Sequence, residues 1–353
     1  MSPEPTTTVS EPQRKRSRRS FRWAKYSDEQ LLELRIGELG LRIDCPRLRP
    51  RINQLYEELT DRGIIFHPPC YLADEWFSPE GVPAIAIPFY LAHPRLEALE
   101  ETMMMEVEGG TRKWCMQLLR HEAGHALDHA YRLSRKRSWR DVFGPPTQAY
   151  TGVYRPRVYS RNFVRHLPND YAQNHPEDDF CETFAVWLNP RSGWRKQYRG
   201  WPVMKKLEYV DWLMRQVAGK PPRVTDGPRM CEARRSRMKL RTYYRRKRRQ
   251  YEEEYPDFYD SGLRRIFADA EEAPEGERAA AFLRRYRREI VDAVSRWTGE
   301  TKYAVYALFQ GITQRAAELS LHRARAESLT ALEVTGYLSS LVMNYRYTGK
   351  LKS

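Results

Sequence analysis

Hydrophobic positions recur at helical spacing along much of the chain, and two stretches show this most strongly. In residues 114–133, WCMQLLRHEAGHALDHAYRL, apolar side chains cover more than a narrow stripe, which is typical of a helix buried at the centre of a fold. In residues 175–190, HPEDDFCETFAVWLNP, Phe180, Phe184 and Leu188 recur every fourth position after Pro176. This pattern predicts a second helix that begins at the proline, because proline is favoured in a first helical turn.

The rest of the pattern predicts an α+β core and a helical C-terminal extension. Helical spacing also occurs in residues 28–41, 49–62, 203–217, 279–298, 302–320 and 329–345. Strand-like apolar runs with Gly and Pro between them occupy residues 64–66, 70–76 and 84–90. We therefore expect a small, mainly antiparallel sheet beside the helix of residues 114–133.

Composition divides the chain into four expected parts. They are a disordered basic tail (residues 1–22), a first domain with both long helices (23–218), a Pro/Gly-containing and then basic linker (219–250) and a mostly helical region (251–353). Inside the first domain, residues 134–170 connect the two long helices with little periodicity. So long a connection in a compact domain is usually functional, and we expect it beside a cleft.

The net charge of +15 concentrates in two clusters, residues 14–19 and 234–249. The densest run is formed by Arg245, Arg246, Lys247, Arg248 and Arg249. Such a run can bind the phosphate backbone of nucleic acid weakly and without sequence preference. The alternative is a solvated basic linker that the acids of residues 252–254 partly neutralise.

The cysteines and the N-terminus bear on the compartment. The five cysteines are scattered, odd in number and without a C-x-x-C pair, which favours reduced thiols in the cytoplasm. The N-terminus lacks the apolar segment of a secretory signal. No run of apolar residues is long enough to span a membrane.

Candidate chemistry lies in the first long helix, where residues 121–125 form an H-E-x-x-H motif. Positions four apart in a helix lie on one face, so His121 and His125 can hold one zinc ion together. Glu122 then lies beside the metal, where it can act as general base toward a zinc-activated water. The alternative is a helix with two unrelated histidines.

A catalytic zinc ion takes three protein ligands, and the second long helix offers the third. Asp178 and Glu182 lie one turn apart on a mostly apolar helix, where buried carboxylates are costly unless a cation neutralises them. The helix dipole explains acids in the first turn without a metal, but Glu182 lies further in. Glu177 is a further alternative as ligand.

The two motif segments, RHEAGHALDHAY and YAQNHPEDDFCETFAVWL, resemble the zinc-binding metallopeptidase family of bacteria and, more distantly, the lethal-factor-type gluzincins. The resemblance covers roughly residues 23–217. It implies a zincin-like core, one zinc ion per chain and Asp178 as third ligand, although these families typically have Glu there. It also implies that Glu182 and Asp128 support the ligands from behind, and that Tyr171 polarises the scissile carbonyl.

The resemblance also implies where a substrate binds. In zincins the strand before the metal helix is usually an edge strand that pairs with extended peptide, and here its candidates are Ala84, Ile85, Ala86 and Ile87. The alternative is an ordinary core strand. The function expected from the sequence is therefore a cytoplasmic zinc-dependent metallopeptidase acting on peptide or protein substrates. The rival hypothesis is a nucleic-acid-associated or interaction protein with a structural or secondary zinc site.

Overall fold

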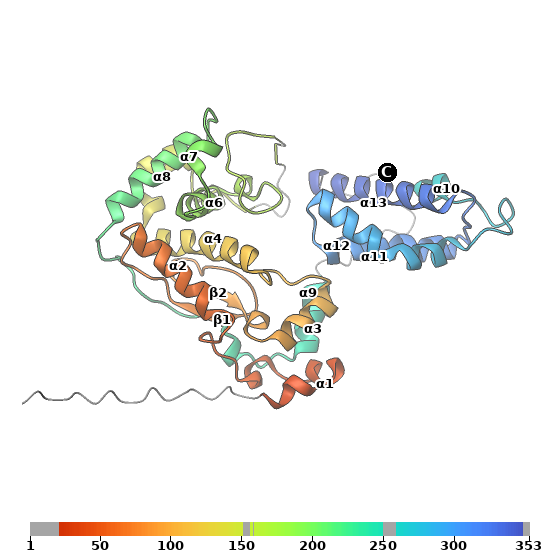
Figure 1. Cartoon of the computed structure of the whole chain (residues 1–353), viewed down its shortest axis with the longest axis horizontal. Coiled ribbons are helices and arrows are strands. Elements are labelled where there is room, and N and C mark those ends of the chain that lie inside the picture. Colours follow the sequence, from red (N-terminus) through yellow and green to blue (C-terminus); the bar gives the residue numbers. More distant parts are fainter. Residues whose placement is uncertain (1–20, 151–155, 158, 250–258, 349–353) are drawn as a thin grey trace, which may run out of the picture.

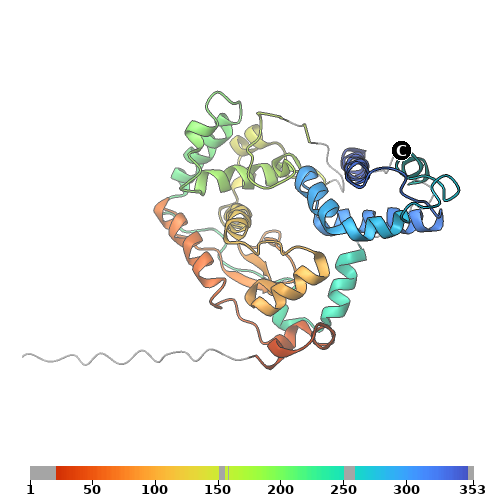
Figure 2. The same cartoon turned by 45° about the vertical axis from the view of Figure 1, so that its right-hand side comes forward.

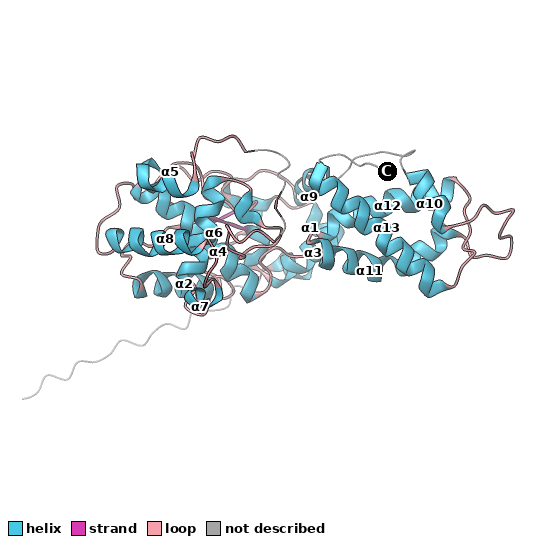
Figure 3. Ribbon diagram, turned by 90° about the horizontal axis from the view of Figure 1, so that it is seen from above, coloured by secondary structure: helices cyan, strands magenta, loops and turns pink. Residues whose placement is uncertain are grey.

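The structure, a computed structural model, describes residues 21–150, 156–157, 159–249 and 259–348. In this part the chain forms two bodies with separate hydrophobic cores (Figure 1). Helices make up most of both bodies, and strands are confined to a small patch in the larger one (Figure 3). Residues 1–20 of the expected disordered tail, including its basic cluster, lie outside the described residues.

The larger body contains both long helices. Its elements are η1 (Arg22–Lys25), α1 (Asp28–Leu32), η2 (Ile36–Leu39), α2 (Arg49–Asp61), β1 (Cys70–Ala73), β2 (Ile85–Pro88), η3 (Phe89–Ala92), α3 (Pro94–Met104), α4 (Arg112–Tyr131), η4 (Leu133–Arg135), α5 (Arg137–Phe143), η5 (Tyr171–Gln173), α6 (Pro176–Leu188), α7 (Trp194–Gln197), α8 (Met204–Val217), η6 (Ala233–Arg235) and α9 (Leu240–Arg249).

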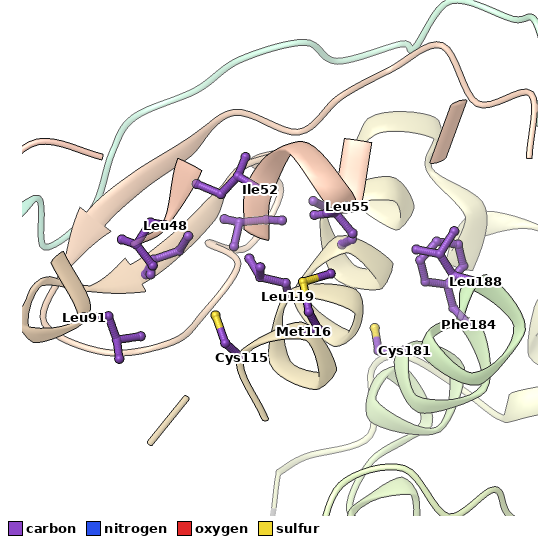
Figure 4. Close-up of a cluster of buried hydrophobic side chains, with 14 of the residues drawn as sticks. Leu48, Ile52, Leu55, Leu91, Cys115, Met116, Leu119, Cys181, Phe184 and Leu188 are labelled. Carbon is purple, nitrogen blue, oxygen red and sulfur yellow. The ribbon is translucent and has the colours of Figure 1, made fainter. Parts of the chain in front are cut away.

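Helix α4 lies in the middle of this body (Figure 2). One of its faces packs on α2 and the sheet, and another packs on α6. Figure 4 shows apolar side chains of α2, α4 and α6 filling the space between these helices, among them Leu55, Leu119 and Phe184. The burial of apolar residues on several faces of α4 agrees with the broad hydrophobic pattern of its sequence.

Local sequence explains where the two long helices begin and how closely they pack. The Thr111 hydroxyl caps α4 by accepting from Trp114 N, and the His175 ring caps α6 by accepting from Glu177 N. At the crossing, a Cβ on Gly124 would lie 2.9 Å from Cys181 Cα and 3.0 Å from Cys181 Sγ. Glycine in the H-E-x-x-H motif therefore lets the backbones of α4 and α6 approach each other directly.

The sheet differs from the expected antiparallel one. Strands β1 and β2 are parallel, with Cys70 opposite Ile85 and Ala73 opposite Pro88. The expectation was wrong because the chain between them does not make a hairpin. It turns back along the far side of β2, where Phe77 forms an antiparallel bridge with Ala86, and only then enters β2.

This topology also corrects the expected substrate strand. Ala84, Ile85, Ala86 and Ile87 are almost completely buried. Strand β2 has β1 on one side, and on the other side Ala86 N donates to Phe77 O at 2.8 Å. The four residues therefore form a core strand, and their backbone is not a free edge for a peptide.

Two further segments differ from their expected form. The helix expected over residues 28–41 is divided into α1 and η2, because Ile36 N donates to Met238 O and Leu34 O accepts from Leu240 N. These bonds join the segment to the expected linker of residues 219–250. The last part of that linker is helix α9, which buries Leu240, Tyr243 and Tyr244 against the larger body.

The smaller body consists of α10 (Asp260–Ile266), α11 (Ala279–Thr298), α12 (Lys302–Glu318) and α13 (Glu327–Thr348). The sequence predicted the last three. Their apolar faces form a core that includes Phe282, Val291, Phe309 and Leu338. Among the described helices, none has the length and apolar content to cross a lipid bilayer.

Candidate metal centre

Helix α4 presents His121 and His125 to α6, and their ring centroids are 5.0 Å apart. Both Nε2 atoms face one carboxylate oxygen: Asp178 Oδ1 lies 3.8 Å from His121 Nε2 and 3.5 Å from His125 Nε2. The three candidate ligand atoms lie within 4.8 Å of one another. Tetrahedral zinc ligands are separated by about 3.3 Å at the usual bond lengths, so small side-chain adjustments would bring the three onto one ion.

Asp178 faces the Nε2 atoms of both imidazoles, whereas Glu182 contacts the opposite nitrogen of His121 and Glu177 lies outside this group. The second oxygen of Asp178 accepts a hydrogen bond from Asn174 Nδ2 at 2.7 Å, which fixes the carboxylate with Oδ1 toward the histidines. Glu177 is half-buried and points elsewhere, with Oε2 3.5 Å from the Tyr150 hydroxyl.

Glu182 supports His121 from behind. His121 Nδ1 donates to Glu182 Oε1 at 2.9 Å, and Leu167 N donates to the other oxygen at 2.8 Å. Burial lowers the pKa of His121, but the Glu182 hydrogen bond and the nearby carboxylates outweigh burial and raise this pKa to about 9. With its Nδ1 proton held by Glu182, His121 can present the Nε2 lone pair to a cation.

Glu122 lies beside the candidate ligands with an unused oxygen. The residue is 7% exposed, and its Oε2 atom has no hydrogen-bond partner among the described residues. Burial raises the pKa of Glu122, while the two imidazoles lower it. A buried carboxylate oxygen without a partner is uncommon in a protein interior, and it is what a proton acceptor for a small bound molecule requires.

The charge balance of the pocket fits a cation. Glu122, Asp178 and Glu182 place three buried carboxylates around the two imidazoles. Several like charges out of water are unfavourable unless a cation neutralises them. Three protein ligands also fit a catalytic zinc ion, which leaves a fourth position open. The His125 side chain is 15% exposed, so solvent reaches the pocket from its side.

Tyr171 lies at the same pocket, with its ring centroid 5.5 Å from that of His121. It begins η5, the short turn that leads into α6. The two preceding residues, Asn169 and Asp170, both have left-handed backbone conformations, with φ of 67° and 53°. Besides glycine, asparagine and aspartate adopt this conformation most readily, so the sequence permits the turn. Here the turn brings the tyrosine toward the metal helix.

Asp128, His166 and His175 are near the site but contribute no candidate ligand. Asp128 is buried and accepts from Ser134 N at 2.6 Å, so its carboxylate closes the turn after α4. His166 and His175 hold the structure around the site together. His166 Nε2 donates to Gln117 O at 3.0 Å, and His175 Nε2 donates to Gln148 O at 2.7 Å while its other nitrogen caps α6.

Sequence reasoning missed two residues beside the site, Asn174 and Tyr150. Asn174 precedes the cap of α6, where helical spacing gives no indication of what its side chain contacts. Tyr150 stacks on His175 with centroids 3.9 Å apart, and it belongs to the long connection between the metal helices. The only signal for Tyr150 was the unusual length of that connection.

The five basic residues of α9 that are candidates for nucleic-acid contact separate into two groups. Lys247 Nζ donates to Glu100 Oε1 at 2.6 Å, and Arg248 donates to Met103 O at 2.7 Å, so both have intramolecular partners. Arg245, Arg246 and Arg249 are exposed. Neighbouring cations are also paired: Lys239 and Arg241 contact Glu33, and Arg234 and Arg235 contact Glu232.

Comparisons of the chain with family models, with curated proteins and with solved structures find no match. The geometry of the site is therefore the basis for a functional conclusion.

Proposed function

We propose that this chain is a zinc-dependent metallopeptidase in which His121, His125 and Asp178 hold one zinc ion. Glu122 is the general base, and Tyr171 is the donor to the substrate carbonyl. The observation that carries the proposal is the convergence of two Nε2 atoms and one carboxylate oxygen on one point, beside a glutamate oxygen that has no hydrogen-bond partner among the described residues.

The unused oxygen of Glu122 favours a catalytic site over a structural one. A structural zinc site is closed by four protein ligands and has no need of a neighbouring base. In this pocket the described residues supply three candidate ligands. Glu122 lies beside the candidate ligands, where its carboxylate would take a proton from a water that the metal activates.

Zinc at this point would polarise a carbonyl and lower the pKa of a bound water. The side chains of the protein position the ligands, transfer the proton and bind the carbonyl oxygen. Glu182 and Asn174 hold His121 and Asp178 in position through hydrogen bonds of 2.9 and 2.7 Å. Glu122 accepts the proton of the attacking water and returns it to the leaving amine. Tyr171 donates a hydrogen bond to the carbonyl oxygen as charge develops there.

The choice of peptide as substrate rests on the resemblance of α4, η5 and α6 to the metallopeptidase families. The scattered cysteines, all free in the described structure, favour the cytoplasm. Nucleic-acid binding through α9 depends on Arg245, Arg246 and Arg249, because Lys247 and Arg248 are held by intramolecular contacts.

The substitution Glu122→Gln tests the proposal. The amide keeps the shape of the side chain but cannot accept the proton, so hydrolysis of a fluorogenic peptide library should fall on the order of 10²- to 10⁴-fold. Zinc content, measured by atomic emission on the purified protein, should remain at one per chain. The control is Glu177→Gln, a neighbouring carboxylate that lies outside the ligand set. Equal turnover of Glu122→Gln and wild type would remove the general base.

A further inference from the structure

A second cavity, of about 640 Å³, opens between α2, the first half of α4 and the chain around residues 189–192. None of the metal-centre residues lines it. Its charged lining is almost entirely basic and comprises Arg112, Lys113, Arg120, Arg165, Arg191 and the single carboxylate Glu58.

That single carboxylate is already neutralised. Arg120 forms two hydrogen bonds with Glu58, of 2.7 and 2.8 Å, and both residues are buried. The other four cations have no carboxylate partner in the described part of the chain. Arg112 donates to the amide oxygen of Gln54 at 2.6 Å, and the Arg165 guanidinium lies 5.3 Å from the centroid of the Trp201 ring. The cavity therefore carries a surplus of four positive charges.

Two of these four cations lie at positions that are unfavourable for the fold itself. Arg112 and Lys113 occupy the first turn of α4, where the helix dipole destabilises positive charge. The same dipole adds to the positive potential of the cavity, because unpaired N–H groups lie at this end of a helix. The Ser192 hydroxyl, also in the lining, is buried without a hydrogen-bond partner among the described residues. A bound anion would neutralise the cations of this first turn and could accept a hydrogen bond from the Ser192 hydroxyl.

We propose that this cavity is a binding site for a compact anion that carries two or more phosphate groups. Its volume lies in the range of small-molecule sites, about 300–1,000 Å³. The cations come from three separate segments and surround one cavity, whereas binding a nucleic-acid strand calls for a groove that follows the backbone and aromatic rings on which bases stack. Arginine forks also match the geometry of phosphate oxygens.

Calorimetric titration of inorganic pyrophosphate into the full-length, metal-loaded protein tests the site. Binding should be saturable, with one pyrophosphate per chain, and should weaken with added salt. In the double variant Arg112→Gln/Lys113→Gln the affinity should fall roughly tenfold or more, since charge-assisted hydrogen bonds are lost. This variant is expected to fold, because removing cations from the first turn of a helix is favourable. A nucleoside diphosphate titrated in parallel distinguishes an organic from an inorganic ligand.

The matched control is Arg288→Gln/Arg296→Gln, which removes the same charge from exposed positions of α11 and should bind as wild type does. Absence of binding at low salt would overturn the proposal, as would equal affinity in the cavity variant and wild type. Binding that survives in the cavity variant but is lost in His125→Ala would assign the anion to the metal centre.

Discussion

At the scale of single residues, the site depends on how three carboxylates divide their roles around two imidazoles. Asp178 is one methylene shorter than the glutamate that the resembling families typically have in its place. In this chain Asn174 holds the outer oxygen, and Oδ1 still reaches within 3.5 Å of His125 Nε2. A short side chain can serve here because Gly124 lets α6 approach α4 closely.

The first prediction concerns the third ligand. Zinc content should fall sharply in Asp178→Ala and remain at one per chain in Glu177→Ala, because Asp178 alone of the two faces the histidines. Metal analysis after dialysis against a weak chelator measures both variants. Full retention of zinc by Asp178→Ala with loss in Glu177→Ala would reverse the assignment.

A second prediction concerns Glu182, which orients His121 without lying among the ligand atoms. Glu182→Gln should weaken zinc affinity about 10- to 100-fold, the usual effect of removing a partner that orients a metal-bound histidine. Competition with a chromophoric zinc chelator gives the dissociation constant. Asn189→Asp, on the far end of the same helix, is a control that should leave the affinity unchanged, and equal affinities in Glu182→Gln and wild type would contradict the orienting role.

At the scale of elements, the candidate ligands come from two helices, α4 and α6, which cross with their backbones in close contact at Gly124. Gly124→Ala adds a Cβ that would meet the backbone of Cys181 at 2.9 Å. In most helices this substitution stabilises by about 1 kcal/mol. Here it should destabilise by about 1–3 kcal/mol, as overpacking does, and should weaken zinc binding. Urea unfolding measures the change.

A control for that experiment is Gly336→Ala in α13, where a Cβ would meet nothing within 4 Å. This substitution should be neutral or stabilising, since it removes a flexible residue from a helix interior. If both alanine variants were stabilised alike, the close approach of α6 to α4 would not be what Gly124 provides.

Periodicity predicted the long helices because each has a clear apolar face and a cap, as α4 has at Thr111 and α6 at His175. It did not predict the parallel pairing of β1 and β2. That pairing depends on the path of residues 74–84 around β2, which no local pattern records. The sequence of α9 was interpreted as a linker because most of its residues are basic, and its three buried side chains are too few to give a clear apolar pattern.

The candidate site also has one part that spacing along the chain could predict and another part that it could not. The spacing of His121, Glu122 and His125 and the acids of α6 were legible from the sequence, since helical geometry alone puts them on common faces. The resemblance already implied Asp178 as third ligand, but spacing alone could not separate it from Glu177 and Glu182, because that depends on how α6 is rotated against α4. The contact of Asn174 depends on the turn before α6 and needed the fold.

At the scale of the whole molecule, α9 is the last described helix of the larger body, and its ion pair with α3 is mostly buried. The Glu100 side chain is 1% exposed and that of Lys247 is 18% exposed. Lys247→Ala leaves this carboxylate without its cation, so the free energy of unfolding should fall by about 3 kcal/mol. Chemical denaturation measures this, and the exposed neighbour Arg246→Ala is the control. Equal small effects of both substitutions would indicate a surface helix instead.

The effect of Lys247→Ala should also depend on pH. Burial raises the pKa of Glu100 above its ordinary value of 4.5, and Lys247 lowers it, so loss of the lysine moves this pKa further up. A carboxyl with a raised pKa binds more protons in the folded state than in the unfolded state, so stability falls as pH rises above 4.5. The destabilisation should be smaller near the unfolded pKa than at neutral pH.

The smaller body also contacts the turn that carries Tyr171. Arg346 of α13 donates to Asn169 O at 3.3 Å and to Thr298 O at 2.6 Å. It therefore holds the first of the two left-handed residues that precede the tyrosine. The contact helps to offset the cost of these left-handed conformations, so we expect the turn to relax when the contact is lost.

Arg346→Ala should therefore lower kcat for peptide hydrolysis on the order of tenfold while one zinc per chain remains bound, since Tyr171 is displaced and the metal ligands are not. Steady-state kinetics and zinc analysis on the same preparation measure both. The control is Arg296→Ala, an exposed residue of the same body that should leave both quantities unchanged. If Arg346→Ala instead lost zinc, α13 would support the metal ligands themselves. An unchanged kcat would mean that the larger body alone holds the tyrosine in place.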